Sequence, residues 1–344
     1  DLRRAEAILT DACERMEAAK GESDIASIRL RRTLSSCLFL QTRFDDVIKL
    51  DRMILERAIN NPDIGDDALL TAGIRGRLAG ILTRSTDPAE LAEAEVLCGQ
   101  AAATLQRQAQ REPRLSKELK YELLQSKFLQ YRVSHLHRDD PKFARDYKEL
   151  VDQAVPQYEA GDEEEVVKDY DGLAIASLEA GVLDIAHDSI KKLKELAPKV
   201  FGGRSPFIRR YDAMWGEYLV QMQQFDQAEQ VLNDVLSAEG TNDDNSFVSS
   251  WDSFFLIRAY CQYGICLRQR NEDVLARQYL EKAMRILDQR VAQMGTFQNR
   301  HMVQERYLIL KQLQGVYADL GEAERAADTQ QTIIELQQIL DRVL

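Results

Sequence analysis

The most constraining feature of this sequence is a small residue followed twelve positions later by an alanine, an arrangement that recurs along the chain. Each copy carries the same spacing of large apolar residues around the pair. Self-similarity at a fixed spacing is the sequence signature of repeat architectures. The clearest copies are Gly216 with Ala228, Gly264 with Ala276 and Ala174 with Ala186, and further copies run through Leu313, Tyr317, Gly321, Ala326 and Ile333, through Leu34, Ser35, Leu38, Val47 and Ile54, and through Tyr131, Ala144 and Val151.

The segments between the prolines have the pattern of amphipathic helices. Apolar residues recur at steps of three and four, as in Ala228, Val231, Leu232 and Val235. Six of the seven prolines fall where this periodicity lapses, and only Pro156 interrupts a helical pattern. The pattern predicts about fifteen helices with short loops, as between antiparallel neighbours. The predicted fold is therefore all-α, a superhelical solenoid of about seven antiparallel helix pairs.

These repeats resemble the tetratricopeptide repeat (TPR), in which a large residue, a small residue, a turn glycine and the pattern A-x-x-x-F-x-x-A follow one another. The resemblance covers roughly residues 28–344 and is strongest in the last four copies. It implies that the small residues let helix A of each pair lie close to helix B.

The repeat period departs from the family pattern. The helix-B alanines lie 42 to 50 residues apart, whereas the usual TPR period is about 34 residues. This spacing resembles the extended repeats of kinesin light chains and of bacterial regulatory helical-repeat proteins. A HEAT-like arrangement stays open for the first repeats. The alanines concerned are Ala94, Ala144, Ala186, Ala228, Ala276 and Ala326.

The pattern predicts a single solenoid over residues 1–344. Residues 1–20 form a lone helix or half repeat, residues 28–160 form divergent repeats, and residues 167–344 form the clearer TPR-like repeats. Ile333, Leu336, Leu340 and Val343 keep a helical apolar spacing to the end of the chain. This edge needs a cover, for which we expect a further helix, an adjoining domain or a second copy of the chain.

Composition narrows the partners and the location. A net charge of −12 would repel a nucleic-acid backbone, so no nucleic-acid partner is predicted. No apolar run is long enough for a membrane span, and no secretory leader is seen in this sequence. The five cysteines lie in helical segments without a pairing pattern, which favours a reducing, cytoplasmic location. Cys261 and Cys266 are expected to be buried thiols.

Motifs for catalysis or cofactor binding are missing. The sequence lacks phosphate-binding glycine loops, a nucleophile elbow and a zinc helix. His135 and His137 lie two residues apart and would face different sides of a helix, so no metal is predicted there. The acidic run that begins at Asp162 suits a helix N-terminus, and Gly202 with Gly203 suits a helix stop. We expect no enzyme and no cofactor.

One basic and aromatic cluster stands out before the last repeats. It contains Arg204, Arg209 and Arg210, with Phe207 and Tyr211 interleaved. The two aromatic residues are four apart and would pack inward, with the arginines in solvent or paired with acids. Alternatively, the arginines would form a docking patch for an acidic peptide or a phosphate, which guanidinium groups bind through two parallel hydrogen bonds.

The TPR resemblance implies that helix-A residues pointing away from helix B line a concave groove that binds a partner. The predicted groove is of mixed charge, with arginines at its middle that would select acidic segments or pair internally with Glu217 and Glu272. The partner-binding residues predicted in this way, together with Arg204 of the cluster above, are Lys168, Arg204, Arg210, Glu217, Gln221, Arg258, Arg268 and Lys311.

Together these features predict a non-catalytic protein-interaction scaffold or recruiting module, with a partner protein or peptide in the groove. The alternative is a regulatory or sensor domain of a larger signalling protein, such as a kinase, protease or transcription regulator, that responds to a peptide or small ligand. A homodimer or adjoining domain is expected at the C-terminal helix.

Overall fold

A computed structural model describes residues 2–111, 141–158, 161–203, 205–237, 250–294 and 298–342. These residues form fourteen α-helices and a short 3-10 helix, Val155–Gln157. The all-α prediction is confirmed. The helices are α1 Leu2–Lys20, α2 Ile25–Leu40, α3 Phe44–Asn60, α4 Leu69–Leu82, α5 Pro88–Arg111, α7 Pro141–Ala154, α8 Glu163–Glu179, α9 Leu183–Phe201, α10 Pro206–Gln221, α11 Phe225–Ser237, α12 Ser250–Gln269, α13 Asp273–Gln293, α14 Arg300–Asp319 and α15 Ala323–Arg342.

The chain divides into two compact units. The N-terminal unit comprises Asp1–Leu136, Val291–His301 and Val343, and the C-terminal unit comprises His137–Arg290, Met302–Arg342 and Leu344. A single solenoid over the whole chain stays a prediction.

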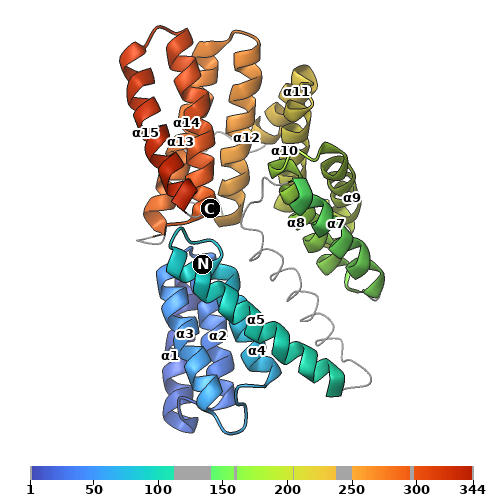
Figure 1. Ribbon diagram of the computed structural model, residues 1–344, viewed down its shortest axis with the longest axis vertical. Helices are drawn as coiled ribbons and strands as arrows, with labels where there is room; N and C mark the ends of the chain where they lie inside the picture. The colour runs from blue at the N-terminus through green and yellow to red at the C-terminus, as the bar shows by residue number, and fades with distance from the viewer. Residues whose placement is uncertain are drawn as a thin grey trace. The chain divides into compact units, whose positions relative to one another are not determined.

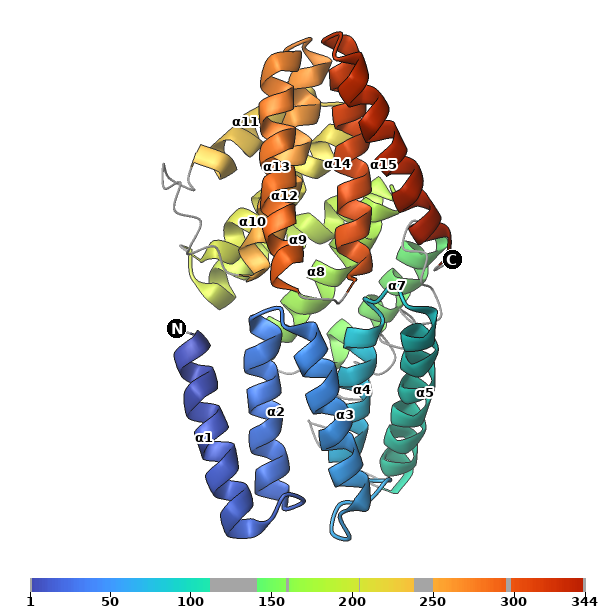
Figure 2. The ribbon, with the colours of Figure 1, turned by 90° about the vertical axis from the view of Figure 1, so that its left-hand side faces the viewer.

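In the N-terminal unit, helices α1 to α5 pack in sequence order, each against the next (Figure 2). Helix α1 packs against α2. The lone helix or half repeat predicted for residues 1–20 stays a prediction. Part of the unit's core comes from Ile28, Ile54 and Ile74, all at most 1% exposed. The α4–α5 turn is joined to the α13–α14 connection, where the Arg300 N–H donates to the Arg84 carbonyl over 2.7 Å.

In the C-terminal unit, consecutive helices such as α8 and α9 pack as pairs (Figure 1). Small residues lie at these contacts, as predicted. Helix α8 packs on α9 with Ala174 and Ala186 fully buried. A methyl group on Gly216 would lie 2.5 Å from Leu232 of α11, so the helix contact leaves no room for a side chain there. A methyl group on Gly264 would lie 2.7 Å from Leu280 of α13. The repeat therefore determines which helix faces pack.

The turns within the helix pairs repeat one backbone geometry. Gln223, Asn271 and Thr42 have φ near 60°, and Gly181 and Gly321 hold the corresponding places with φ of 67° and 75°. In each turn the following N–H donates to a carbonyl five residues earlier, the hydrogen bond of a Schellman motif. Glycine adopts positive φ without strain, whereas other residues do so at some cost.

Replacing Gln223 with glycine should therefore raise the free energy of unfolding by about 1 kcal/mol, since the left-handed strain of a non-glycine residue is relieved. The gain is measured by urea denaturation followed by circular dichroism. The reverse change Gly181→Gln should lower stability by a similar amount, and equal stabilities of Gln223→Gly and the wild type would contradict the strain argument.

Three prolines mark helix starts. Pro88, Pro141 and Pro206 are the first residues of α5, α7 and α10, where the missing N–H is not needed. Pro198 differs from the expectation, because α9 continues past it to Phe201. It lies in the last turn, where few following residues depend on the helix. Gly202 then ends the helix with φ of 82°, which confirms the predicted stop.

Candidate partner-binding site

Charged side chains from four helices of the C-terminal unit meet around Arg258. We call α8, α10, α12 and α14 the A helices, the first member of each pair. Arg258 of α12 donates from Nη2 to Glu217 Oε1 of α10 over 2.7 Å. Its Nε lies 3.5 Å from Glu305 Oε1 of α14, and its Nη1 lies 3.8 Å from Glu179 Oε1 of α8. We call these four residues the Arg258 cluster.

The Arg258 cluster is buried and carries more acids than bases. Arg258, Glu217 and Glu305 are 8%, 3% and 6% exposed. Burial raises the pKa of Glu217, and it raises the pKa of Glu305 to about 7, although the charge of Arg258 opposes both shifts. The neighbouring carboxylates raise the pKa of Arg258, so the guanidinium stays charged. Near neutral pH, the cluster therefore exchanges a proton at Glu305.

A second buried pair lies between the same A helices. Arg210 of α10 pairs with Asp171 of α8, and its guanidinium lies 3.9 Å from the ring centroid of Phe255 on α12. Arg210 is 8% exposed and Tyr211 is 2% exposed. The inward packing expected for Tyr211 is confirmed, and Arg210 pairs with an acid on the adjacent A helix.

Two more predicted groove residues connect neighbouring A helices. Gln221 of α10 donates from Nε2 to the Leu178 carbonyl of α8 over 3.0 Å. Arg268 of α12 donates to Asp319 of α14 over 2.9 Å. Both side chains are half-buried. With Arg210, Glu217 and Arg258, they hold adjacent repeats together.

The remaining predicted residues are exposed or outside the described part. Lys168 lies 2.9 Å from Glu164 on its own helix. Lys311 is exposed, with its Nζ 5.4 Å from the ring centroid of Tyr307. Arg204 lies outside the described residues. The internal pairing considered for the arginines occurs at Glu217, while Glu272 lies 3.6 Å from Arg270 instead.

Sequence reasoning missed Glu305, which completes the Arg258 cluster. A signal was present, because Glu305, Ile309 and Leu313 are four residues apart and share one face of α14. Ile309 and Leu313 are 0% and 3% exposed. An acid in phase with buried apolar residues indicates a buried charge, but the helix that supplies its partner cannot be read from this spacing.

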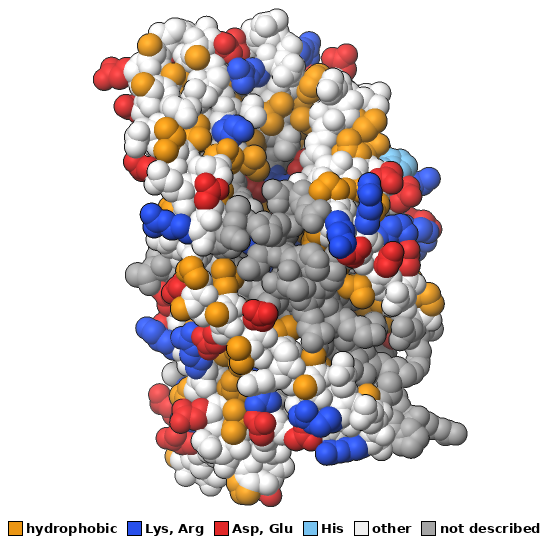
Figure 3. Space-filling view, viewed as in Figure 1, with side chains coloured by type: hydrophobic (Ala, Val, Ile, Leu, Met, Phe, Trp, Pro, Cys, Tyr) orange, Lys and Arg blue, Asp and Glu red, His pale blue; other side chains and the backbone are white. Residues whose placement is uncertain are grey.

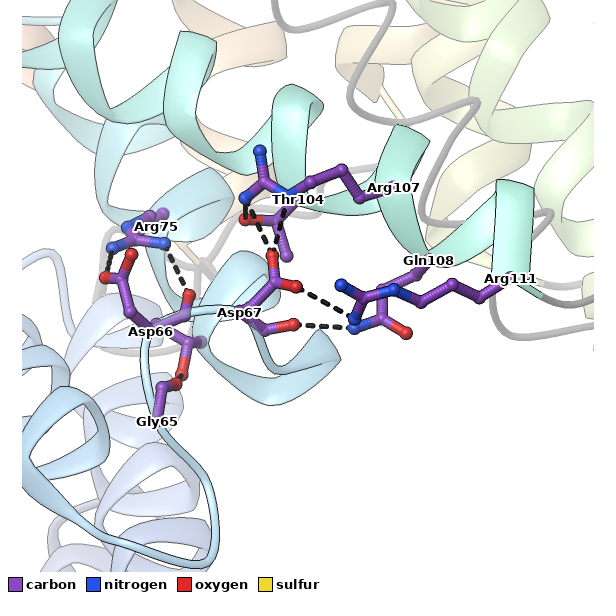
Figure 4. Close-up of polar contacts among 9 residues, drawn as sticks. Gly65, Asp66, Asp67, Arg75, Thr104, Arg107, Gln108 and Arg111 are labelled. Carbon is purple, nitrogen blue, oxygen red and sulfur yellow. Dashed lines mark hydrogen bonds and ion pairs between the residues drawn. The ribbon is translucent and has the colours of Figure 1, made fainter.

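Polar clusters in the N-terminal unit hold its loops in place. Asp67, in the α3–α4 loop, accepts hydrogen bonds from Arg107 Nη2 over 2.7 Å and Arg111 Nη1 over 3.0 Å on α5 (Figure 4). Gln108 donates to the Asp67 carbonyl over 2.7 Å. The hydrogen bonds from Arg107 are the largest cause of the lowered pKa of Asp67. Because the arginines occupy the carboxylate oxygens of Asp67, these contacts indicate a structural role.

The described residues offer little for metal or thiol chemistry. They contain no group of three or more His, Cys, Asp or Glu side chains placed to hold a metal ion. All five cysteines are free and buried, as expected for Cys261 and Cys266. Burial raises the pKa of the Cys266 thiol to about 12. His135 and His137 lie outside the described residues.

Basic and acidic side chains are interspersed on the described surface of the face drawn in Figure 3. Within the described ranges, no helix combines the length and apolar content that crossing a bilayer requires.

The buried Glu305 predicts a pH dependence of stability. Its folded pKa of about 7 lies above its ordinary value of 4.5, so the folded chain keeps a proton that the unfolded chain releases. Its contribution to stability is complete below about pH 4.5 and is lost as the pH rises through about 7, by up to about 3 kcal/mol. Glu305→Gln should remove this slope in urea denaturation across that range; a difference between variant and wild type that is constant with pH would contradict it.

Comparisons with known proteins agree with the observed geometry. No protein-family model matches the chain, and no curated protein sequence matches it. A Rap protein complexed with competence and sporulation factor aligns with a TM-score of 0.60 at 12% identity, over 92% of this chain and 78% of that one. The apo form of RapI aligns with a TM-score of 0.53 at 11% identity, over 90% and 76%.

The helix pairs, the repeated turns and these structural likenesses define the class. The chain is a TPR-like helical-repeat protein, as the sequence pattern indicated. Identities of this size show a shared fold.

Proposed function

We propose that this chain is a non-catalytic interaction module whose C-terminal unit binds a segment of a partner protein along its A helices. The observation that supports this most is Leu308 on α14, which is 47% exposed on an A helix. Lys311, one turn further along, is also exposed. Apolar surface rimmed by polar residues marks sites of protein–protein interaction, and Leu308 beside Lys311 would contribute to such a surface. The Rap protein of similar fold holds a factor in its complex, which accords with this role.

Whether the partner segment is acidic depends on whether the predicted groove arginines are available to bind it. Arg210, Arg258 and Arg268 all pair with acids of neighbouring A helices. A preference for acidic segments would require at least some of them to leave these pairs, so we do not retain that preference. A second copy or an adjoining domain at α15 stays a prediction.

A ligand-responsive sensor domain is a second candidate function. The Arg258 cluster joins four A helices, so a ligand that engages it would change the packing between repeats. A sensor should shift in thermal stability or shape with a peptide or small molecule. A passive scaffold should change in shape or thermal stability only when its protein partner binds.

The module is tested by selecting peptides from a displayed random library against the whole chain. Titration calorimetry then measures each selected peptide with Leu308→Asp and with Lys311→Glu. We expect affinities about tenfold weaker or more, because a contact at the centre of an interface carries much of its binding energy.

The matched control is Lys199→Glu on α9, an exposed lysine of a B helix. It should leave binding unchanged. Failure to select any peptide, or selected peptides whose affinity ignores both A-helix variants, would overturn the proposed function.

A further inference from the structure

A single antiparallel bridge joins two helix connections that lie far apart in the sequence. Ser85 of the α4–α5 connection lies opposite Asn299 of the α13–α14 connection. Beside this pair, the Thr86 N–H donates to the Gln298 carbonyl over 3.1 Å. Thr86 and Gln298 are 212 residues apart. The bridge therefore closes a long loop of chain, and we call residues 298–300 the strap.

The bridge lies in a buried place within the N-terminal unit. Ser85, Asn299 and Arg300 are 3%, 5% and 6% exposed. Buried backbone groups need hydrogen-bond partners, and here the Arg300 N–H donates to the Arg84 carbonyl over 2.7 Å. The strap belongs to the N-terminal unit with the rest of Val291–His301, although most of α13 and α14 belongs to the C-terminal unit. The N-terminal unit thus includes a segment that lies, in the sequence, between two helices of the other unit.

Each side of the bridge has hydrogen bonds that hold its own turn in shape. Ser85 Oγ accepts a hydrogen bond from the Asp87 N–H over 3.0 Å, and Asp87 Oδ1 accepts one from the Ala89 N–H at the start of α5. Asn299 Oδ1 accepts a hydrogen bond from the His301 N–H over 3.0 Å at the start of α14. Contacts of this kind cap helix N-termini and form within a few residues of chain. Both turns can therefore keep their form when the bridge opens.

The bridge is also short. It joins one pair of residues and is isolated from any strand in the described part of the chain. Local openings that break a few hydrogen bonds need much less free energy than the unfolding of a whole unit. A contact between two preformed turns, made across a long loop, is of this kind.

We propose that the strap opens and closes on the α4–α5 connection without unfolding of either unit. The closed strap fixes the start of α14, and the open strap releases it. A ligand that binds one of these states better shifts the strap toward that state. This device goes beyond the proposed function, because it concerns a different part of the chain and needs no bound peptide.

The first test is amide hydrogen exchange of the whole chain, followed by mass spectrometry. We expect the amides of Thr86 and Arg300 to be protected at least about a hundredfold less than the amide of Leu78, because they exchange through local opening. Leu78 is fully buried on α4 of the same unit and serves as the reference. Equal protection at the three amides would mean that the bridge opens only when the unit unfolds, and would overturn the proposal.

The second test locks the strap with a disulfide between Ser85→Cys and Asn299→Cys. The hydrogen bonds on either side make this a non-hydrogen-bonded antiparallel pair, whose Cα atoms lie about 4.5 Å apart and within the range that a disulfide spans. Oxidation should raise the protection of the Thr86 and Arg300 amides about tenfold or more, and leave Leu78 unchanged.

The matched controls are the reduced double variant and the single variant Ser85→Cys under the same oxidant. Both should exchange at Thr86 and Arg300 as fast as the wild type or faster, since the cysteine removes one capping contact. Failure of the disulfide to form, or equal protection in the oxidised and reduced double variant, would overturn the strap.

Discussion

Arg258→Gln should lower the free energy of unfolding by about 3–5 kcal/mol near neutral pH, because it leaves buried carboxylates without their cation. Arg258 lies within 4 Å of Glu179, Glu217 and Glu305. Urea denaturation followed by circular dichroism measures the loss. The loss should be smaller in acid, where protons neutralise the three carboxylates.

The control for this prediction is Arg325→Gln on α15, whose guanidinium pairs with Glu322 but is 60% exposed. Exposed pairs contribute about 0–1 kcal/mol. If Arg258→Gln destabilised the chain no more than Arg325→Gln, the Arg258 cluster would not hold the A helices together.

Gly264→Leu should destabilise the C-terminal unit by about 3 kcal/mol or more, because its side chain would enter a closed helix contact. A methyl group on Gly264 would already lie 2.7 Å from Leu280 Cγ and 3.3 Å from the Ala276 carbonyl oxygen. Leu280 and Ala276 are fully buried, so a leucine side chain at position 264 would have to displace core atoms. The helices α12 and α13 would separate.

Gly99→Leu provides the matched control for this change. Gly99 lies inside α5 with no atom within 4 Å of an added methyl group. Leucine there should stabilise the helix by up to about 1 kcal/mol, through its higher helix propensity. Urea midpoints compare the two variants. A stable Gly264→Leu would mean that the small residues do not determine the helix packing.

These predictions show how far local sequence patterns carry. The interval from Gly264 to Ala276 predicted a close helix contact. Glycine has no side chain, so it lets the neighbouring helix approach. The turn at Gly321 was also predicted, because a glycine holds the turn position of the TPR pattern. Pro198 was placed outside its helix, because a single turn beyond a proline has too little periodicity to be recognised.

The predicted groove residues show what such sequence patterns do not predict. The TPR resemblance selected Arg210, Glu217 and Arg258 as residues on the A helices, and they lie there. Their burial depends on acids from other helices, 39 residues away for Asp171 opposite Arg210 and 47 residues away for Glu305 opposite Arg258. The helical period places a side chain on a face of its own helix and contains no information on its partner.

The sequence alone thus determined the all-α repeat, the small-residue contacts and the helices on which charge would gather, because these depend on periodicities within a few turns of chain. The tertiary structure decided that Arg210, Arg258 and Arg268 pair with acids of neighbouring helices and that Glu305 is buried beside Arg258. That outcome depends on how successive A helices are placed side by side, and on burial that makes each unpaired charge costly.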